Sequence, residues 1–583
     1  MDGSVALILK YGKRFCPMAM SFCPASSCKP LRDQSVPAAP RTNGARILEP
    51  SAEHVADLLA DNRAIIDRSD YDVQGIRLAE LASQARRQLI AAALAYTRQY
   101  RDVPEPPPER GNGSTVELPP LLLAGHQPEI FHPGVWLKNF VLHRLAERHG
   151  GVAINLVIDS DTIKSSSLRV PVGSVEKPRV ASVLFDRPSA EIPFQARVIQ
   201  DPDVFASFGA RAAERLAPLV ADPMVREFWP LAVECGRRTK NLGQALSQAR
   251  HQWEGRWGLT TLEIPQSVVC CLPAFRHFMA HLIAHLPRLW EVYNSALAEY
   301  RREHHVRSHS HPAPELASEG ARLEAPFWIW SAENPRRRRV FVLPRGDDLV
   351  LSDMQGWEIS LRLSPDSETG TAVVQLSALC DRGVKLGSRA LLTTLAARVL
   401  FGDLFIHGIG GAKYDRLTDA MIQRFFCISP PAFLVASGTL HLPIAHQSPT
   451  AADLRMVRSR LRELEFHPEK FLDSQSPADA SQPSAILATE PNDLGAAYWI
   501  HEKQQWIAAN VGAEESRRRC RAIREANRQL QPFVADRRAE LVGRGESLNA
   551  QLRADAILSS REYGFCLYPQ ETLRNFLPGF PSG

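Results

Sequence analysis

The chain has 583 residues, of which 44% are hydrophobic and 23% are charged, close to the averages of soluble globular proteins. No stretch approaches the ~18 consecutive apolar residues of a transmembrane helix, which argues against a membrane protein, and the composition argues against a collagen-like or wholly disordered chain. The 69 lysines and arginines exceed the 64 acidic residues by only five, without the concentrated basic face of a nucleic-acid binder. We therefore expect a small-molecule substrate, no nucleic acid and no membrane.

The ten cysteines are too sparse for a disulfide scaffold, and none forms a C-x-x-C pair, so we expect a reduced, cytoplasmic protein. Cys270 and Cys271 are adjacent and follow an apolar run, which predicts buried thiols.

The start of the chain divides into two predicted parts. Residues 1–50 are rich in Ser, Pro, Ala and Cys without sustained periodicity, which predicts a disordered leader. Residues 51–118 are predicted to be an N-terminal helical segment that ends in a Pro-rich linker. Three consecutive prolines in this linker, at 106–108, cannot continue a helix.

Residues 119–202 carry the strongest pattern and predict the first part of an α/β core. An apolar strand at 121–124, a turn rich in Gly, Pro and His at 125–134, a helix at 135–148 and a second apolar strand at 152–158 follow one another. Strand, helix and strand in this order indicate a βαβ unit and a parallel sheet, whose ligands bind at the carboxyl ends of the strands. A further strand is expected at 180–185.

The rest of the chain predicts insertions and a second part of the same core. We expect a helical insertion at 203–258, a core strand and a long helix at 259–324, and a β-rich segment at 325–365. Residues 366–450 are predicted to complete a Rossmann-like core, with a helix capped by Ser388, a strand running into a glycine-rich turn, and a last strand. Residues 451–583 predict a helical coiled-coil region and tail, in which residues 496–558 are expected to form an antiparallel helical pair that turns near Pro532 or near residues 543–545.

The first candidate site is the turn that contains Gly125, His126, Gln127, His132 and Gly134. A helix N-terminus suits a phosphate or a carboxylate, and a histidine there can donate to developing charge. Class I nucleotidyl transferases carry H-x-G-H at this place, and here the tetrad H-P-G-V lacks the second histidine. The alternative interpretation is a tight strand-to-helix turn with a capping histidine.

Two further clusters follow predicted strands. Asp159 and Asp161 are expected to bind a ribose or a substrate amine or to act as a general base, the alternative being an Asx turn. The second cluster is a glycine-rich segment that suits a pyrophosphate or carboxylate, although it has neither Walker A nor G-x-G-x-x-G spacing. Its candidate binding residues are His407, Gly408, Gly410, Gly411 and Lys413.

Histidines also recur at His277, His281 and His285, on one face of a predicted helix. Histidines four residues apart can share a metal ion. Because no H-E-x-x-H motif and no nearby cysteine pair accompanies them, we expect half-buried side chains and no metal site.

With these turns in view, the chain resembles the BshC family, the cysteine-adding enzymes of bacillithiol biosynthesis. That family has a turn of the type GQQ…G, a following helix with a lysine, and a strand that ends in an acidic cluster. Matching places are held here by Gly125, Gln127, Gly134, Lys138, Asp159 and Asp161. The family's late GGPGE turn is matched by Gly410 and Gly411, without the Pro and Glu.

The resemblance implies a Rossmann-like core, an inserted connective domain and a helical coiled coil that is often dimeric. It implies an enzyme that joins an amine- or thiol-bearing small molecule, such as cysteine, to a sugar-type metabolite. His126, Gln127 and His132 would then orient the electrophile, with Lys138 and the late glycines at the binding site. The alternatives are another nucleotide-using transferase, for which ATP is a candidate cofactor, and a non-catalytic assembly protein that dimerises through its C-terminal helices.

Overall fold

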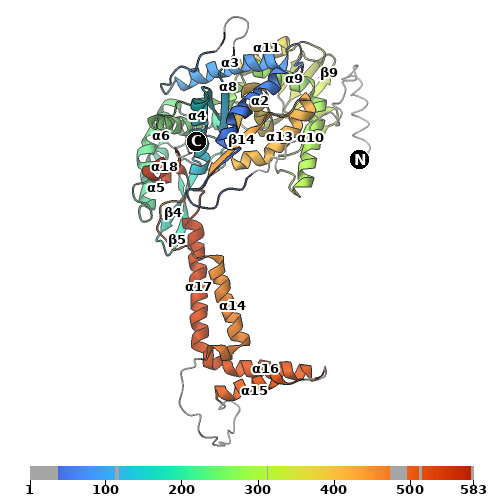
Figure 1. Ribbon diagram of the computed structural model, residues 1–583. Helices are drawn as coiled ribbons and strands as arrows, with labels where there is room; N and C mark the ends of the chain where they lie inside the picture. The colour runs from blue at the N-terminus through green and yellow to red at the C-terminus, as the bar shows by residue number, and fades with distance from the viewer. Residues whose placement is uncertain are drawn as a thin grey trace, which may run out of the picture. The chain divides into compact units, whose positions relative to one another are not determined.

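The computed structural model describes residues 37–578 except 110, 112–116, 312, 473–494, 511 and 513–514. The protein is mixed α/β (Figure 1), and the chain divides into two compact units. The first unit comprises Met1–Val170, Ala181–Pro443 and Arg561–Gly583, and the second comprises Pro171–Val180 and Ile444–Ser560. Among the helices so described, none is long and apolar enough to cross a membrane.

The core of the first unit is a six-stranded sheet in which five strands are parallel and one edge strand is antiparallel. Its spatial order is β1 (Arg46–Glu49), β14 (Phe433–Gly438), β13 (Leu404–His407), β2 (Leu121–His126), β3 (Val152–Val157) and β6 (Leu262–Pro265). From β2 the chain first adds β3 and β6 on one side, and only later adds β13 and β14 on the other. The order of the strands therefore reverses between β2 and β13.

Helices cover both faces of this sheet. Leu121 and Leu123 of β2 share a buried cluster with helices that include α3 (Leu78–Thr97), whereas the equally buried Leu122 points to the opposite face, because side chains alternate along a strand. That opposite face is covered by α4 (Pro133–Arg148), which packs on β2, β3 and β14. Burial on both faces explains why these strands are continuous apolar runs.

The remaining helices of the first unit lie in the connections between core strands, apart from α18, which follows the last core strand. They are α2 (Val55–Asp67), α5 (Pro202–Leu216), α6 (Val225–Thr239), α7 (Leu242–Arg256), α8 (Gln266–Val269), α9 (Pro273–Ala284), α10 (Leu286–Glu303), α11 (Gly370–Asp381), α12 (Ala390–Ala396), α13 (Ile409–Phe426) and α18 (Gln570–Phe576). The predicted helical insertion corresponds to α5, α6 and α7, and the predicted long helix is interrupted near Pro287, where α9 ends and α10 begins.

A second, antiparallel sheet corresponds to the predicted β-rich segment. Its members are β7 (Ser318–Glu319), β8 (Arg322–Ser331), β9 (Arg338–Arg345), β10 (Asp348–Ser352), β11 (Glu358–Leu361) and β12 (Val384–Ser388). The predicted boundary at residue 365 is wrong, because β12 pairs with β8 and belongs to this sheet. For the same reason Ser388 ends a strand instead of capping a helix, and Arg389 is the N-cap of α12.

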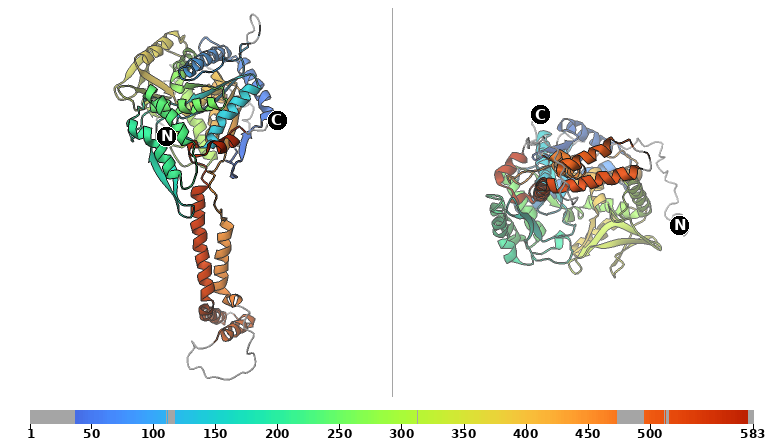
Figure 2. Two further views of the ribbon diagram at one scale, coloured as in Figure 1. Left: turned by 90° about the vertical axis from the view of Figure 1, so that its left-hand side faces the viewer. Right: turned by 90° about the horizontal axis from the view of Figure 1, so that it is seen from below.

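The second unit contains two helix pairs, α14 (Ala451–Phe466) with α17 (Ala535–Leu558) and α15 (Ala496–Ala508) with α16 (Ser516–Leu530). Both views show α14 and α17 side by side (Figures 1 and 2), and Leu464 at the end of α14 shares a cluster with Val534 just before α17, so the pair is antiparallel. The chain turns at residues 531–534, at the predicted Pro532, whereas residues 543–545 lie inside α17. The antiparallel pair expected within residues 496–558 is wrong, because α17 pairs with α14 and α16 pairs with α15.

Three other expectations about element positions need correction. The leader predicted at 1–50 is wrong at its end, because Arg46–Glu49 forms β1 against β14; residues 1–36 lie outside the described residues. The strand expected at 180–185 is β5 (Pro178–Leu184), which pairs with β4 (Ser167–Gly173) in a separate hairpin and not in the core. The tail assigned to the coiled-coil region belongs to the first unit from Arg561 onward, where the aromatic Phe565 and Tyr568 are fully buried.

Candidate functional site

Polar side chains gather where the core strands end at their carboxyl termini. The helices that follow β2 and β13, α4 and α13, begin at this edge on either side of the reversal in strand order. Unpaired N–H groups at the start of a helix favour an anion, and the reversal point is where open α/β sheets bind ligands.

Lys138 places a buried ammonium group at this edge. Its side chain comes from the second turn of α4, is 3% exposed, and donates from Nζ to the carbonyl oxygen of Gly125 at 2.8 Å. Burial, together with the charge of Arg250, lowers the pKa of Lys138 to about 8. In the described part of the chain no carboxylate pairs with Lys138, and the contact that stabilises its charge is the carbonyl of Gly125.

His132 caps α4 and remains neutral at physiological pH. Its Nδ1 accepts from the backbone N–H of Gly134 at 3.1 Å, which leaves the proton of the neutral ring on Nε2. Burial and the nearby charges of Arg561 and Lys138 lower the pKa of His132 to about 4. The capping histidine that the sequence offered as an alternative is thus present, and its Nε2–H is available as a donor.

His126, the last residue of β2, has the opposite tautomer to His132, with its ring proton on Nδ1. Its Nδ1 lies 3.0 Å from the carbonyl oxygen of Gln127 and donates to it, so Nε2 is left as an acceptor. Burial, and then the charge of Lys138, lower the pKa of His126 to about 3. The turn between β2 and α4 therefore has a neutral imidazole at each end. Nε2 of His132 donates a hydrogen bond, and Nε2 of His126 accepts one.

The end of β14 adds residues that the sequence did not indicate. Arg561, from the C-terminal segment, donates to Thr439 Oγ1 at 3.0 Å and lies 3.4 Å from His132 Nε2 and 3.5 Å from Ser437 Oγ. Even Arg561 and Thr439, the two residues of these contacts that are nearest along the chain, are 122 positions apart. A local sequence pattern therefore could not have connected them.

The predicted acidic residues lie on the other side of β2, at the end of β3. Gln127 donates to Asp161 Oδ2 at 3.0 Å, and Arg337 pairs with Asp161 Oδ1 at 3.1 Å. Asp161 also accepts from the N–H of Thr162, the next residue, whereas the Asx turn that the sequence left open would bond the N–H two residues on. Arg337 was visible in the sequence only as part of an arginine run.

Asp159 is more deeply buried and differs in its protonation. Its two carboxylate oxygens accept from the N–H and the hydroxyl of Ser267, which follows β6. Burial raises the pKa of Asp159 to about 6, although the bonds from Ser267 oppose the shift. The group is ionised at neutral pH and can accept a proton in the range where a general base is useful.

This raised pKa predicts a measurable pH dependence. The folded state holds the Asp159 proton between the ordinary pKa, near 4, and about 6, so ionisation destabilises the fold as pH rises through that interval. From pH 5 to pH 7, wild type is expected to lose about 1 kcal/mol of unfolding free energy relative to Asp159→Asn, measured by urea denaturation. If the unfolding free energies of wild type and Asp159→Asn change in parallel with pH, the raised pKa of Asp159 is wrong.

The glycine-rich segment is not the predicted turn, because Gly410 and Gly411 lie in the first turn of α13 and Gly408 is its N-cap. A Cβ added to Gly411 would lie 2.8 Å from His407 Nδ1, whereas nothing lies within 4 Å at Gly410. Gly411 thus leaves room for an imidazole, and Gly410 leaves open space. Lys413, predicted to bind an anion, is exposed one turn into α13.

His407 belongs to a buried ion chain under this helix start. Its Nε2 contacts Asp415 Oδ2 at 3.0 Å, and Asp415 also pairs with Arg398 at 2.6 Å. Although burial opposes ionisation of Asp415, Arg398 and His407 lower its pKa to about 2. His407 is therefore held in a fixed orientation, and its role at the edge is to position the start of α13.

The predicted Gly134 is required for packing. A Cβ at this residue would lie 2.0 Å from the carbonyl oxygen of Gly438, so α4 approaches β14 more closely than any side chain permits. Gly125 has ordinary contacts, 3.4 Å to Leu156 of β3. Of the glycines expected to face a ligand, Gly134 instead faces the protein's own backbone.

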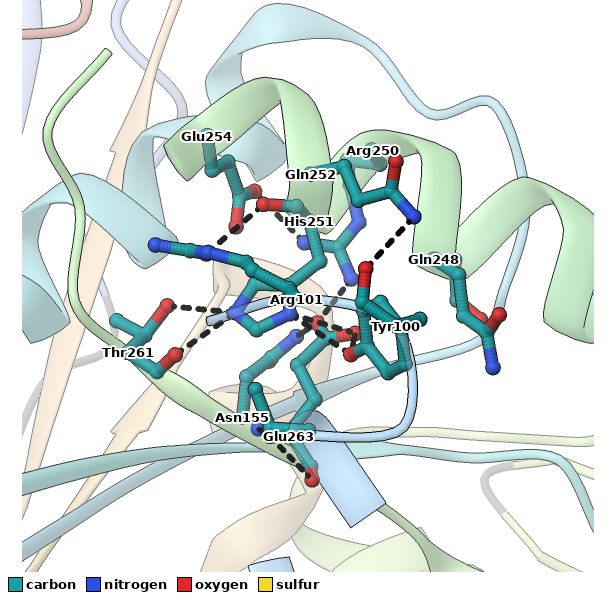
Figure 3. A network of polar contacts seen from close by, with 12 residues as sticks. Tyr100, Arg101, Asn155, Gln248, Arg250, His251, Gln252, Glu254, Thr261 and Glu263 are labelled. Carbon is teal, nitrogen blue, oxygen red and sulfur yellow. Dashed lines mark hydrogen bonds and ion pairs between the residues drawn. The ribbon is translucent and has the colours of Figure 1, made fainter. Parts of the chain in front are cut away.

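A second buried polar cluster adjoins this edge (Figure 3), since its Arg250 is close enough to lower the pKa of Lys138 and of His126. His251, Glu254 and Glu263 place ligand atoms within 4.8 Å of one another, as a metal site requires. Arg250 already lies between the two carboxylates and bonds to both, which supplies the positive charge a metal would bring. The cluster is therefore a structural ion network.

The histidine face of α9 also has protein partners. His277 bonds the carbonyl of Val73 at 2.6 Å, and His281 Nε2 bonds the Tyr71 hydroxyl at 2.9 Å. The ring of His285 packs against that of His281, and His281 is almost completely buried, not half-buried as expected. In comparisons with known proteins, no family model and no curated protein matches the chain.

Proposed function

We propose that the protein is an enzyme of the BshC type, which joins an amine- or thiol-bearing small molecule, such as cysteine, to an anionic sugar-type metabolite. The strand order of the core sheet supports a Rossmann-like interpretation, with the substrate at the reversal between β2 and β13. The resemblance in the turn after β2 and in the acidic cluster after β3 points to the same edge.

The observation that carries the proposal is the buried Lys138 ammonium, for which no carboxylate partner is found among the described residues. A buried charge left unpaired is costly, and an anionic ligand at the edge supplies the missing counter-charge. The Nε2–H of His132 and the guanidinium of Arg561 lie next to one another and present further donors. We therefore assign the anion-binding role to these three residues in place of Lys413.

We propose that the remaining residues bind and deprotonate the nucleophile. Asp159 is proposed to accept the proton of the incoming amine or thiol, and Asp161 and Gln127, joined by a hydrogen bond, to position it. His126 Nε2 would accept from a hydroxyl or amine of the metabolite and fix its orientation. The amine or thiol and the metabolite would then lie next to each other at the carboxyl end of β2.

A nucleotide-using transferase is the second candidate, favoured by the open first turn of α13. Among the described residues, a Cβ added to Gly410 would meet no atom within 4 Å and one added to Gly408 only Lys138 Cδ at 3.9 Å, so open space adjoins the start of a helix whose N–H groups suit a phosphate. ATP is the nucleotide we would test first.

We also propose that α14 and α17 form an antiparallel coiled coil that supports a homodimer. Met456 on α14 and Val542 on α17 are 59% and 41% exposed, which leaves apolar surface on this pair. The sedimentation behaviour of the purified chain tests the dimer separately from the catalytic proposal.

Product formation tests the enzyme. We expect protein incubated with cysteine and glucosaminyl-malate to form their condensation product, with the loss of one water detected by mass spectrometry, with or without ATP. Formation only with ATP would show that the nucleotide is consumed. Binding of ATP without any cysteine-dependent product would favour the second candidate and reject the first.

A further inference from the structure

Two cysteine thiols far apart in the sequence lie in direct contact in the first unit. Cys271 lies between α8 and α9, and Cys380 is near the end of α11, with 2.6 Å between their sulfur atoms. This is well inside the distance at which two sulfur atoms merely touch. Both residues are partly exposed, so a small reagent reaches them. The buried thiol predicted for Cys271 is therefore wrong, whereas the neighbouring Cys270 is buried as predicted.

The surroundings of the two thiols are unequal. Arg276 bonds Ser377, one turn before Cys380 on α11, and also lies within hydrogen-bond reach of Cys380, whereas the positive charges of Arg276 and Lys385 act on both thiols. The hydrogen bond from Cys271, followed by Arg276, lowers the pKa of Cys380, while the same contact raises the pKa of Cys271. Cys380 is therefore the thiol of the pair that ionises more readily, and the thiolate is the reactive form.

We infer that Cys271 and Cys380 are a redox-active pair, converted to an intramolecular disulfide by exchange with a low-molecular-weight disulfide. The Cys380 thiolate attacks one sulfur of the small disulfide, and one small thiolate leaves and takes up a proton. The Cys271 thiol then loses its proton and attacks Cys380 Sγ in the mixed disulfide, expelling the second small thiolate. Two protein thiols are oxidised, and one small disulfide is reduced to two thiols.

The position of the pair connects it to the candidate site. Cys271 follows α8, whose first residues Gln266 and Ser267 bond Ser160 and Asp159 at the end of β3. A disulfide would tie the end of this short helix to α11, across 109 positions of sequence. The oxidised protein is expected to melt on the order of 3 °C higher than the reduced protein, because the link restricts the unfolded chain.

The test uses the full-length protein, reduced and then freed of reductant, and incubated without oxygen with oxidised glutathione. Free thiols are alkylated, and a digest made without reductant is analysed by mass spectrometry. We expect a cross-linked peptide pair that contains Cys271 and Cys380. In Cys271→Ser, Cys380 should carry glutathione, and in Cys380→Ser, Cys271 should react about tenfold more slowly.

Cys520→Ser is the matched control, because Cys520 is an exposed thiol in the second unit and its loss should leave the cross-link unchanged. Separate glutathione adducts on Cys271 and Cys380, without a cross-link, would overturn the inference. So would full alkylation of both thiols under conditions that modify Cys520. Neither result depends on the catalytic proposal, because the readout is the chemical state of the two sulfur atoms.

Discussion

Arg250→Met is expected to lower the free energy of unfolding by about 3–5 kcal/mol, because it leaves two buried carboxylates without their counter-charge. Arg250 of α7 lies between Glu254 and Glu263, all three almost completely buried (Figure 3). Burial opposes the charge of Arg250, yet the two carboxylates outweigh it and raise its pKa. Urea denaturation followed by circular dichroism measures the loss.

Arg87→Met is the matched control. Arg87 of α3 also pairs with a glutamate, Glu109 at 2.9 Å, but both side chains are well exposed and water can replace the lost partner. We expect its unfolding midpoint to match that of wild type. Equal midpoints for Arg250→Met and wild type would show that the network in Figure 3 does not hold α7 against the core sheet.

Gly134→Ala is expected to cost about 3 kcal/mol or more, since its Cβ would lie 2.0 Å from the backbone oxygen of Gly438 and α4 would have to move away from β14. Gly410→Ala is its control, because Gly410 occupies the same second helical position in α13 with nothing within 4 Å. There alanine should be neutral or stabilise by up to about 1 kcal/mol.

Thermal unfolding of the two alanine variants compares them under one set of conditions. Movement of α4 would also displace His132 and Lys138, so Gly134→Ala should weaken ligand binding as well as stability. If both variants unfold at the wild-type temperature, the close approach of α4 to β14 is wrong.

Local patterns were enough to predict the first half of the core. The apolar runs of β2 and β3, with a histidine and a proline at the start of α4, are signals contained within a few turns of chain. They placed His126, His132 and the two aspartates at one edge, where the structure has them. The insertion helices α5 to α7 followed from periodicity in the same way.

Other parts depend on tertiary packing that a local pattern does not contain. Gly410 and Gly411 disfavour a helix by propensity, yet α13 includes them because Gly411 makes room for His407. Arg561 joins the site across 429 residues from His132. Lys138 was named only through a family resemblance, because burial of a lysine on an apolar helix face is not visible in its spacing.

We propose that Lys138, at the reversal in strand order, provides the positive charge that binds an anionic substrate. The most direct measurement is calorimetric titration of glucosaminyl-malate into wild type, Lys138→Met and Lys413→Met, two lysines from the helices that follow β2 and β13. We predict binding at least about tenfold weaker in Lys138→Met and unchanged in Lys413→Met, a difference of about 1.4 kcal/mol. Unchanged binding in Lys138→Met, or a loss confined to Lys413→Met, would contradict the account.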